Sequence, residues 1–582
     1  MTDIDQVIIL FYLCALIVLG LFLRRRASQS IQTYFLGGRR IPWWILGISG
    51  TTSFLDMTGT MVIASFFFIV GVKGILVELR GGVALILAFL MVFMGKWYSR
   101  SKVMTTAEWM EFRFGSGKQG DAARFLNAVV NIVNTVAMVG YFFVGTGKFL
   151  SLFLPFSPRV CSLIMISVCL FYTAMSGLFG VVYTDLLQAV LIVFATAYVS
   201  VKAFLTIDAT KLQAIAPAGW TDITPRWFIE MPSGYEIYHL FGLSVMFFFL
   251  KVMIEGFAGQ QAMVAQRYFA SPSDRDSGRL SALWTICLSF RWPFIMGIAV
   301  LGLYLGDKVS EPEMVLPAVL ATLIPSGIKG LVIAALIAAA MSTFDSTINA
   351  GASYLVKDIY EKFINPRASE KRLIKASYAS SILIVVLGVL IGAVTPSINA
   401  IWGWITMSLG AGMMLPLLLR WYWWRFNGYG YAIGTAIGTF GAILQRVFVP
   451  SLPEWTAFLI VGSAAILGML IGTYGFPPTD KEVLGKFYTI TKPMGFWKPV
   501  TLKMKAQTLK LIKRENYRDL FALVFAIPWQ MSLFLTSIHA VIHEWNRFFL
   551  FLSFFLLSSI GLYFTWYRFL KGENGKNSLT RP

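Results

Sequence analysis

Long apolar segments recur along the whole chain and are separated by short polar connections. A helix needs about 20 apolar residues to cross the hydrocarbon layer of a membrane, so segments of this length predict spanning helices. We expect about fifteen of them, at residues 5–23, 42–70, 75–98, 124–152, 159–177, 180–205, 237–262, 280–305, 327–357, 376–395, 398–419, 429–450, 455–475, 519–541 and 546–569. The pattern predicts an all-α polytopic membrane protein.

Composition supports this prediction. Of the 582 residues, 57% are hydrophobic and the mean hydropathy is +0.70, whereas soluble proteins hold about 45–50% apolar residues. We expect one large embedded domain at 1–475, a basic amphipathic cytoplasmic segment at 476–518, and two further spans with a short cytoplasmic tail at 519–582.

The net charge of +20 follows the predicted topology. If the N-terminus is outside, alternate connections are cytoplasmic and hold most of the 49 lysine and arginine residues, as the positive-inside rule requires. Asp3 and Asp5 precede the first span and Arg24 follows it. The charge therefore indicates contact with the anionic headgroups of a bilayer, and we expect no nucleic-acid partner. We expect a plasma (inner) membrane protein with a cytoplasmic C-terminus.

One predicted span carries polar groups at membrane depth. In the segment 330–360, Ala339, Ser342, Thr343 and Ser346 are spaced by three, four and seven residues and share one helix face. Small hard cations prefer oxygen ligands, although small residues and serines are also typical of close helix packing. Packing does not need a carboxylate, so the neighbouring Asp345 favours an ion or solute path.

Two predicted spans are interrupted. The first, 42–70, contains Gly50, Asp56 and Gly59, and the second, 237–262, contains a glycine-rich EGFAGQQ sequence near its end. Paired interruptions in corresponding positions of two halves are typical of transporters built from inverted repeats. Free carbonyls at such breaks can become ligands. The alternative is that both are ordinary glycine-containing spans.

Enzyme chemistry finds little support in the sequence. The chain holds three histidines, His239, His539 and His543, and lacks an HExxH motif. Its four cysteines all lie inside predicted spans without metal or disulfide spacing. We therefore expect a protein that is not an enzyme.

Five motifs resemble those of a known family. They are YFLGGRRIPWW at 34–44, LDMTG at 55–59, GVVYTDLLQAV at 180–190, GQQAMVAQRYFA at 259–270 and LIAAAMSTFDSTINAGASYLVKDIY at 336–360. Together they resemble the sodium:solute symporter family over about residues 5–475. The resemblance implies a LeuT-type fold, an inverted repeat of 5+5 core helices, here with one preceding helix and about four following helices.

The resemblance also implies a sodium site between the first and eighth core helices. Its ligands would be the main-chain carbonyls of Phe54, Met57 and Ala339 and the hydroxyls of Ser342 and Thr343. Asp56 lies between two of the carbonyl donors and would support the cation from behind them.

A second cation site found in some family members would use Asp185, Ser342, Asp345 and Ser346. Asp345 stands where those members have a serine, and two close carboxylates can share a proton. This site would bind sodium, carry a proton, or form a structural network.

Three cations lie at membrane depth and are candidate solute contacts: Arg80, Lys251 and Arg291. Arginine fits carboxylates and phosphates, but Glu78, Glu255 and the aspartates would serve equally as internal partners. Further expected solute contacts are Phe257, Gln261 and Trp404. The solute would be a sugar or an anionic carboxylate.

We therefore predict a sodium-coupled secondary active symporter that imports a small organic solute by alternating access. Na⁺ would be the coupling ion, and we expect no cofactor and no obligatory protein partner. The alternatives are a proton-coupled symporter of the same fold and a transporter-derived membrane sensor without flux.

Overall fold

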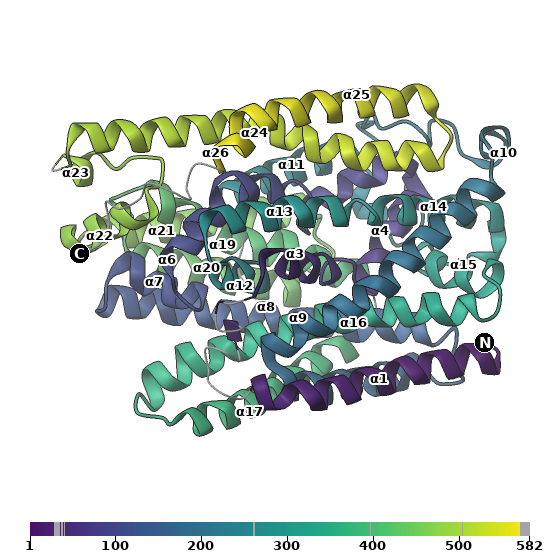
Figure 1. Ribbon diagram of the computed structural model, residues 1–582, viewed down its shortest axis with the longest axis horizontal. Helices are drawn as coiled ribbons and strands as arrows, with labels where there is room; N and C mark the ends of the chain where they lie inside the picture. The colour runs from purple at the N-terminus through teal and green to yellow at the C-terminus, as the bar shows by residue number, and fades with distance from the viewer. Residues whose placement is uncertain are drawn as a thin grey trace.

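The structure is a computed structural model of the chain. It describes residues 1–570 except 28–34, 37, 38, 40, 260, 261, 396 and 503, and the side chains of 20–27, 172–180, 262 and 263 are also not described. Within the described residues the fold is helical, with a single isolated β-bridge between Trp423 and Phe496. Most helices run along the long axis of the molecule (Figure 1).

Among the described residues, eleven helical segments are long and apolar enough to cross a membrane, where about fifteen were predicted. The main helices are α1 (Asp3–Ala27), α3 (Trp43–Thr52), α4 (Met57–Val70), α7 (Thr106–Phe114), α8 (Lys118–Leu150), α9 (Pro158–Thr206), α11 (Phe241–Ala258), α12 (Ala262–Ala270), α13 (Asp274–Leu288), α14 (Arg291–Leu305), α16 (Ile328–Ser353), α17 (Glu370–Ala393), α19 (Gly410–Tyr422), α20 (Gly428–Phe448), α21 (Glu454–Gly475), α24 (Ala506–Val541) and α25 (Trp545–Leu562). The shorter elements are η2 (Gly71–Arg80), α5 (Ile86–Phe89), η3 (Leu90–Met94), α6 (Gly95–Ser101), η4 (Glu236–Tyr238), η7 (Tyr354–Ile364), α18 (Ile398–Gly403), η8 (Trp404–Leu409), α22 (Lys481–Thr491) and α23 (Lys498–Thr501).

The two ends of the helical bundle are distinguished by the predicted topology. The end that holds Asp3, Leu150 and Ala393 is called the outer end below, and the end that holds α7, α12 and α22 is called the inner end. In Figure 1 the N-terminus and α15 (Val315–Leu323) lie at the outer end, on the right, and α22 lies on the left.

Both predicted interruptions are present. The helix break at residues 53–56 separates α3 from α4, and the second break begins at Gly259, after α11. Gly259 has φ +76°, a conformation that L side chains rarely adopt. A Cβ at this glycine would lie 2.4 Å from the Tyr98 hydroxyl, so the position also has no room for a side chain.

Helix boundaries differ from the prediction in places. The spans predicted at 159–177 and 180–205 both lie in α9, whose separate apolar stretches among the described residues are Pro158–Phe171 and Val181–Thr206. The predicted span 280–305 lies within one apolar segment, Asp274–Lys308, which has a turn at Ser289 and Phe290 between α13 and α14. Local hydropathy does not distinguish such joints because the residues on both sides are equally apolar.

α16 is the central helix of the bundle and is buried along nearly its whole length. It packs against α9, α8, α17 and α1. Runs of alanine at 334–335 and 338–340 allow this close approach, since small side chains let helix backbones come together. The polar face predicted on this helix is therefore inside the protein and not toward lipid.

The last two long helices, α24 and α25, pack against each other as an antiparallel pair along one side of the bundle (Figure 1). α24 begins at Ala506, so the predicted boundary at 518/519 falls inside a continuous helix. The pair is attached at the inner end through Lys96, which lies 2.6 Å from both Glu515 and Asp519. At the outer end, Arg547 contacts Asp222.

Candidate functional site

The first helix break is shaped by Asp56. Its side chain caps α4 by accepting a hydrogen bond from the Gly59 amide at 2.6 Å, which satisfies one free donor of the new helix. A Cβ at Gly59 would lie 2.7 Å from Asp56 Oδ2 and 3.0 Å from the Tyr141 hydroxyl. Asp56 is thus held as a helix cap, and the predicted support of a cation is not tested by this contact.

Oxygen atoms of α16 face the break. Thr343 Oγ1 lies 2.9 Å from the carbonyl oxygen of Ser53 and 3.1 Å from that of Ala339. Ser342 Oγ donates to Thr52 Oγ1 at 3.1 Å. Hydroxyl and carbonyl oxygens in this arrangement suit a small hard cation.

The structure thus brings together some of the residues predicted for the first sodium site, and sodium binding there stays a prediction. Ala339, Ser342 and Thr343 all face the break as expected. The break carbonyl in contact with Thr343 belongs to Ser53, one residue before the predicted Phe54. Phe54 lines a cavity described below, and Met57 is the fully buried first residue of α4.

A positively charged side chain that the sequence analysis did not select lies beside these oxygens. Arg267, on α12, is fully buried. Its Nη2 donates to Ser53 Oγ at 2.6 Å, to Ser49 Oγ at 3.0 Å, and to Ser346 Oγ and the Ser49 carbonyl at 3.1 Å. The available signal was a basic residue in the QRY sequence at 266–268, a few residues after the second interruption.

Asp185 completes the same cluster. This fully buried carboxylate accepts hydrogen bonds from Ser49 Oγ at 2.5 Å and from Ser342 Oγ at 2.6 Å. Ser49 thus touches both Asp185 and Arg267, and the two charges compensate each other within one network. A buried carboxylate is tolerated in such a setting because it is both hydrogen-bonded and near an opposite charge.

The four residues predicted for a second cation site are distributed around this network. Asp185, Ser342 and Ser346 are members of it. Asp345 is fully buried on α16 and lies near Tyr12 of α1 and Cys169 of α9. The sharing of a proton between the two aspartates stays a prediction.

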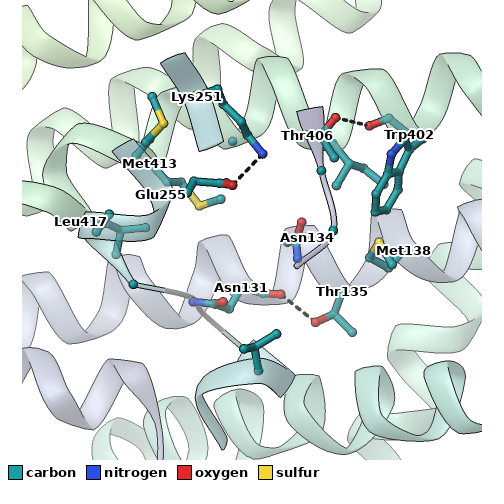
Figure 2. A pocket seen from close by; sticks show the side chains of 18 of the residues that line it. Asn131, Asn134, Thr135, Met138, Lys251, Glu255, Trp402, Thr406, Met413 and Leu417 are labelled. Carbon is teal, nitrogen blue, oxygen red and sulfur yellow. Dashed lines mark hydrogen bonds and ion pairs between the residues drawn. The ribbon is translucent and has the colours of Figure 1, made fainter. Parts of the chain in front are cut away.

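A cavity of about 170 Å³ adjoins the first helix break through Phe54 (Figure 2). Phe54, Gly81 and Gly82 contribute to its lining, and so do Thr347 on α16 and Gly259 at the end of α11. Figure 2 shows that side chains from α8, α11 and the α18–α19 region point into it. The cavity therefore lies between both helix breaks.

Polar side chains in the cavity come from several helices. They are Asn131, Asn134 and Thr135 on α8, Lys251 and Glu255 on α11, Thr347 on α16 and Thr406 on η8. The amides and hydroxyls among them both donate and accept hydrogen bonds. The indole of Trp402 adds an aromatic face. The three α8 residues carry no distinguishing signal in the sequence, because their helix has the pattern of an ordinary amphipathic span.

Lys251, which the sequence predicts as a solute contact, lines this cavity. It forms an ion pair with Glu255 one turn later on α11, with 2.8 Å between Nζ and Oε2. The lysine side chain is 3% exposed and the glutamate side chain 21%. The pair therefore places a cationic hydrogen-bond donor and an anionic acceptor side by side on the α11 wall of the cavity.

Arg80 and Arg291 have internal partners and are absent from the described cavity lining. Arg80 lies 2.7 Å from Glu454 and 2.6 Å from both the Tyr238 hydroxyl and Asn399 Oδ1. Arg291 Nη1 lies 3.0 Å from Glu78 Oε1. This is the internal neutralisation that the sequence left open as the alternative to solute contact.

The other predicted solute contacts differ from their expected positions. Trp404 donates its indole N–H to the Ala442 carbonyl at 2.8 Å and faces α20, and Trp402 lines the cavity instead. Phe257 packs on Phe89 with ring centroids 4.9 Å apart and faces a different cavity. Gln261 lies outside the described residues.

The outer side of the cavity is closed by the Arg80 network. It joins η2, η4, α18 and α21 through Arg80, Tyr238, Asn399 and Glu454. Nearby, Lys148 at the end of α8 pairs with Glu313, 2.6 Å away. The helix ends that meet here come from distant parts of the chain.

Comparisons with known proteins agree with this geometry. The model of the family described as "Sodium:solute symporter family" matches residues 34–438. A sodium/glucose cotransporter of Vibrio parahaemolyticus is 24% identical over an alignment 491 residues long, and the alignment covers 77% of this chain and 86% of that protein. A sodium/sialic acid symporter of Proteus mirabilis is 24% identical over 415 residues, 69% of this chain and 78% of that protein.

The fold is also shared with a solved structure. A Na⁺-coupled sialic acid symporter in a substrate-bound outward-open state superposes with a TM-score of 0.67 at 20% identity, covering 82% of this chain and 98% of that one. The prediction of a LeuT-type fold is confirmed. The family match covers more than half of the sequence and includes both helix breaks and α16. The chain belongs to the sodium:solute symporter family.

Proposed function

We propose that this symporter imports a small polyhydroxylated or acidic organic solute together with one sodium ion in each cycle. The observation that carries the proposal is the position of Thr343. Its hydroxyl meets the Ser53 and Ala339 carbonyls at the first helix break, next to a cavity lined by polar groups. An ion held there and a solute held in the cavity would both contact the break region.

The sodium ion would act by favouring one conformation over the other. A ligand shifts such an equilibrium only as far as its affinities for the two states differ. An ion bound between Ser53 and Thr343 would tie the broken helix to α16. Loss of the ion would remove this link. The two conformations would therefore differ in their affinity for sodium.

The position of the cavity and the buried network on its outer side are consistent with an inward-facing state. The cavity is lined by Met413 and Leu417 on α19 and by Ala258 at the inner end of α11. On the outer side, Arg80 and Glu454 are buried in the network that joins four elements. Import would require this network to open toward the outside, which we expect to be the exterior of a plasma (inner) membrane.

The cavity residues support the solute class. Asn131, Asn134 and Thr406 offer donors and acceptors that match the hydroxyls of a sugar. Trp402 offers an apolar face, and Lys251 can bind a carboxylate by exchanging part of its contact with Glu255. The volume of about 170 Å³ suits a small solute, because pockets for drug-sized ligands measure about 300–1,000 Å³.

The buried guanidinium supports a stoichiometry of one sodium ion. Arg267 donates to Ser49, Ser53 and Ser346, whose oxygens would otherwise serve a second cation. Arginine stays charged and attached to the chain. Of the three roles predicted for the second site, this favours a structural network.

One sodium ion provides enough free energy for concentrative uptake of a neutral solute. A charge that crosses 100 mV gains about 2.3 kcal/mol, and a tenfold sodium gradient adds about 1.4 kcal/mol. Together they support a solute gradient of roughly several hundredfold. An anionic solute would cancel the charge and lose the voltage contribution.

The test is uptake by the full chain in proteoliposomes with an imposed sodium gradient. A thermal-shift screen of sugars, sugar acids, carboxylates and amino acids with sodium present would first identify the solute. We expect uptake to stop when choline replaces sodium at fixed pH. Uptake that continues with a proton gradient alone would establish the proton-coupled alternative, and solute binding without flux would establish the sensor.

A further inference from the structure

A second cavity, of about 680 Å³, lies at the inner end of the bundle. Its walls are α11, α19, α24 and the segment between α22 and α23. Met253, Ile254 and Phe257 line it from α11, and Leu418 and Leu520 line it from the opposite helices. The lining is mainly apolar, so the cavity is suited to hydrocarbon.

The rim of this cavity is positively charged. Lys513 on α24 is the charged residue among the described residues that line it. Lys510 and Arg514 flank it on the same helix, and all three side chains are exposed. A basic residue near a membrane surface contributes about 1 kcal/mol to the attraction of anionic lipid.

The position along α24 places the rim at the membrane boundary. The basic part of this helix, 506–518, precedes the apolar span that the sequence predicts to begin at 519. Two large side chains next to the cavity, Phe496 and Tyr517, are 76% and 71% exposed. Aromatic side chains are enriched at membrane–water interfaces.

We propose that this cavity is a binding site for an anionic phospholipid. The acyl chains would occupy the apolar space between α11, α19 and α24, and the phosphate would lie beside Lys513. The apolar lining suits the acyl chains, and the positively charged rim suits the phosphate. A free phosphate would contact only the basic rim and would leave the apolar cavity empty, so a phospholipid fits the site better.

The site is mechanically connected to the solute cavity. Met253, Ile254 and Phe257 face the lipid cavity, whereas Lys251 and Glu255, on the other side of the same helix, line the solute cavity. The two cavities therefore share α11 as a wall.

The inner end of α11 is also held by residues next to the lipid cavity. The Tyr422 hydroxyl, which lines that cavity, donates to the Phe257 carbonyl at 2.8 Å. The Trp421 indole donates to the Ala258 carbonyl at 3.0 Å. Both carbonyls belong to the last turn before the break at Gly259. A lipid beside Tyr422 would therefore change the freedom of the broken helix, and with it the rate of transport.

Lipid binding to the purified full-length protein tests the site directly. The probes are phosphatidylglycerol and phosphatidylcholine of equal chain length in mixed micelles, with retention on the protein measured by native mass spectrometry. We expect phosphatidylglycerol to be retained at least fivefold more than phosphatidylcholine. Equal retention of the two lipids by the parent protein would overturn the proposal.

Two matched pairs of variants locate the binding. Lys513→Gln is expected to remove most of the preference for phosphatidylglycerol, whereas Lys481→Gln, an exposed lysine on α22, leaves it unchanged. Leu520→Trp fills the cavity and is expected to reduce retention of both lipids. Val524→Trp places the same side chain one turn further along α24 at a site that is 60% exposed, and leaves retention unchanged.

These comparisons separate the lipid site from sodium coupling, because retention is measured without a sodium gradient. If Val524→Trp reduces retention as much as Leu520→Trp, the lipid is bound on the outside of α24 and the cavity proposal fails. If retention depends on Lys513 and Leu520, uptake by the parent protein is expected to rise at least twofold as the fraction of phosphatidylglycerol in the proteoliposomes is increased. Uptake by Leu520→Trp is expected not to rise. The absence of this rise would reject the connection to transport.

Discussion

Two neighbouring groups of oxygen atoms between the first helix break and α16 differ in their partners, and so in the cation that we propose for each. Around Thr343, a hydroxyl meets the main-chain carbonyls of Ser53 and Ala339. Around Ser49 and Ser346, hydroxyls accept hydrogen bonds from the guanidinium of Arg267. The first group suits an ion that arrives and leaves, and the second holds a charge that belongs to the protein.

The difference suggests how one face of α16 can serve both sodium coupling and the stability of the fold. A mobile ion provides free energy from its gradient, whereas a tethered arginine cannot, because it never crosses the membrane. The arginine instead balances Asp185 and joins α12 to α3 and α16. On this view, residues of the predicted second cation site keep the broken helices together.

The largest effect is expected when the tethered charge is removed. Arg267→Gln leaves Asp185 as a buried charge without compensation, and breaking a buried pair in this way costs about 3–5 kcal/mol. We expect a strong fall in thermal stability, measured by unfolding in detergent with and without sodium. Arg267→Gln combined with Asp185→Asn is expected to recover more than half of the loss.

The same variant tests the stoichiometry. With the guanidinium gone, the hydroxyls of Ser49, Ser53 and Ser346 become available to an ion, and the Hill coefficient for sodium is expected to rise from about 1 toward 2. Arg267→Lys keeps a charge at this position and serves as the control. A Hill coefficient near 2 in the parent protein would show that more than one sodium ion binds with Arg267 present and would refute the proposed stoichiometry.

The next largest effect is expected at the mobile-ion position. Thr343→Ala removes the hydroxyl that contacts Ser53 and Ala339, and we expect at least a tenfold increase in the sodium concentration for half-maximal uptake, or about 1.4 kcal/mol. Thr343→Ser keeps the hydroxyl and is expected to stay within threefold of the parent. Equal losses in the two variants would point to packing of the Thr343 methyl group instead of ion binding.

A third cation, Lys251, sharpens the comparison because it faces the solute cavity. Hydrogen bonds to charged groups contribute about 1.5–3 kcal/mol, so Lys251→Gln is expected to weaken binding of an acidic solute at least tenfold. Binding of a neutral sugar is expected to change less than threefold. Thermal shifts with matched sugar and sugar-acid pairs measure the difference, and equal weakening of both would exclude Lys251 as a carboxylate contact.

The smallest effect is expected from Ser346→Ala. This change removes one of the oxygens that receive Arg267, and the guanidinium keeps Ser49 and Ser53 as partners. Because the charged donor keeps these other acceptors and is not left unpaired, a modest loss of thermal stability with unchanged sodium dependence is expected. If the affinity for sodium falls tenfold instead, Ser346 is a ligand of the ion.

The sequence by itself determined the features that depend on local pattern. Apolar segment lengths predicted the spans, glycine and polar residues predicted the breaks near Asp56 and Gly259, and helical spacing predicted the shared face of Ser342, Thr343 and Ser346. These features are encoded over a few turns of chain, so a single stretch of sequence is sufficient to show them. Even here the exact joints, such as that between α13 and α14, escaped prediction because hydropathy is the same on both sides.

Only the tertiary structure decided which charges meet. Arg80 and Glu454 are 374 residues apart in the sequence, and Arg291 and Glu78 are 213 apart. Arg267 reaches Ser49 from the other half of the repeat. A buried charge takes the partner that folding brings within reach, and the spacing of residues along the chain carries no record of that distance. For the same reason, Asn131 and Thr135 were recognisable as cavity residues only after α8 had been placed beside both helix breaks.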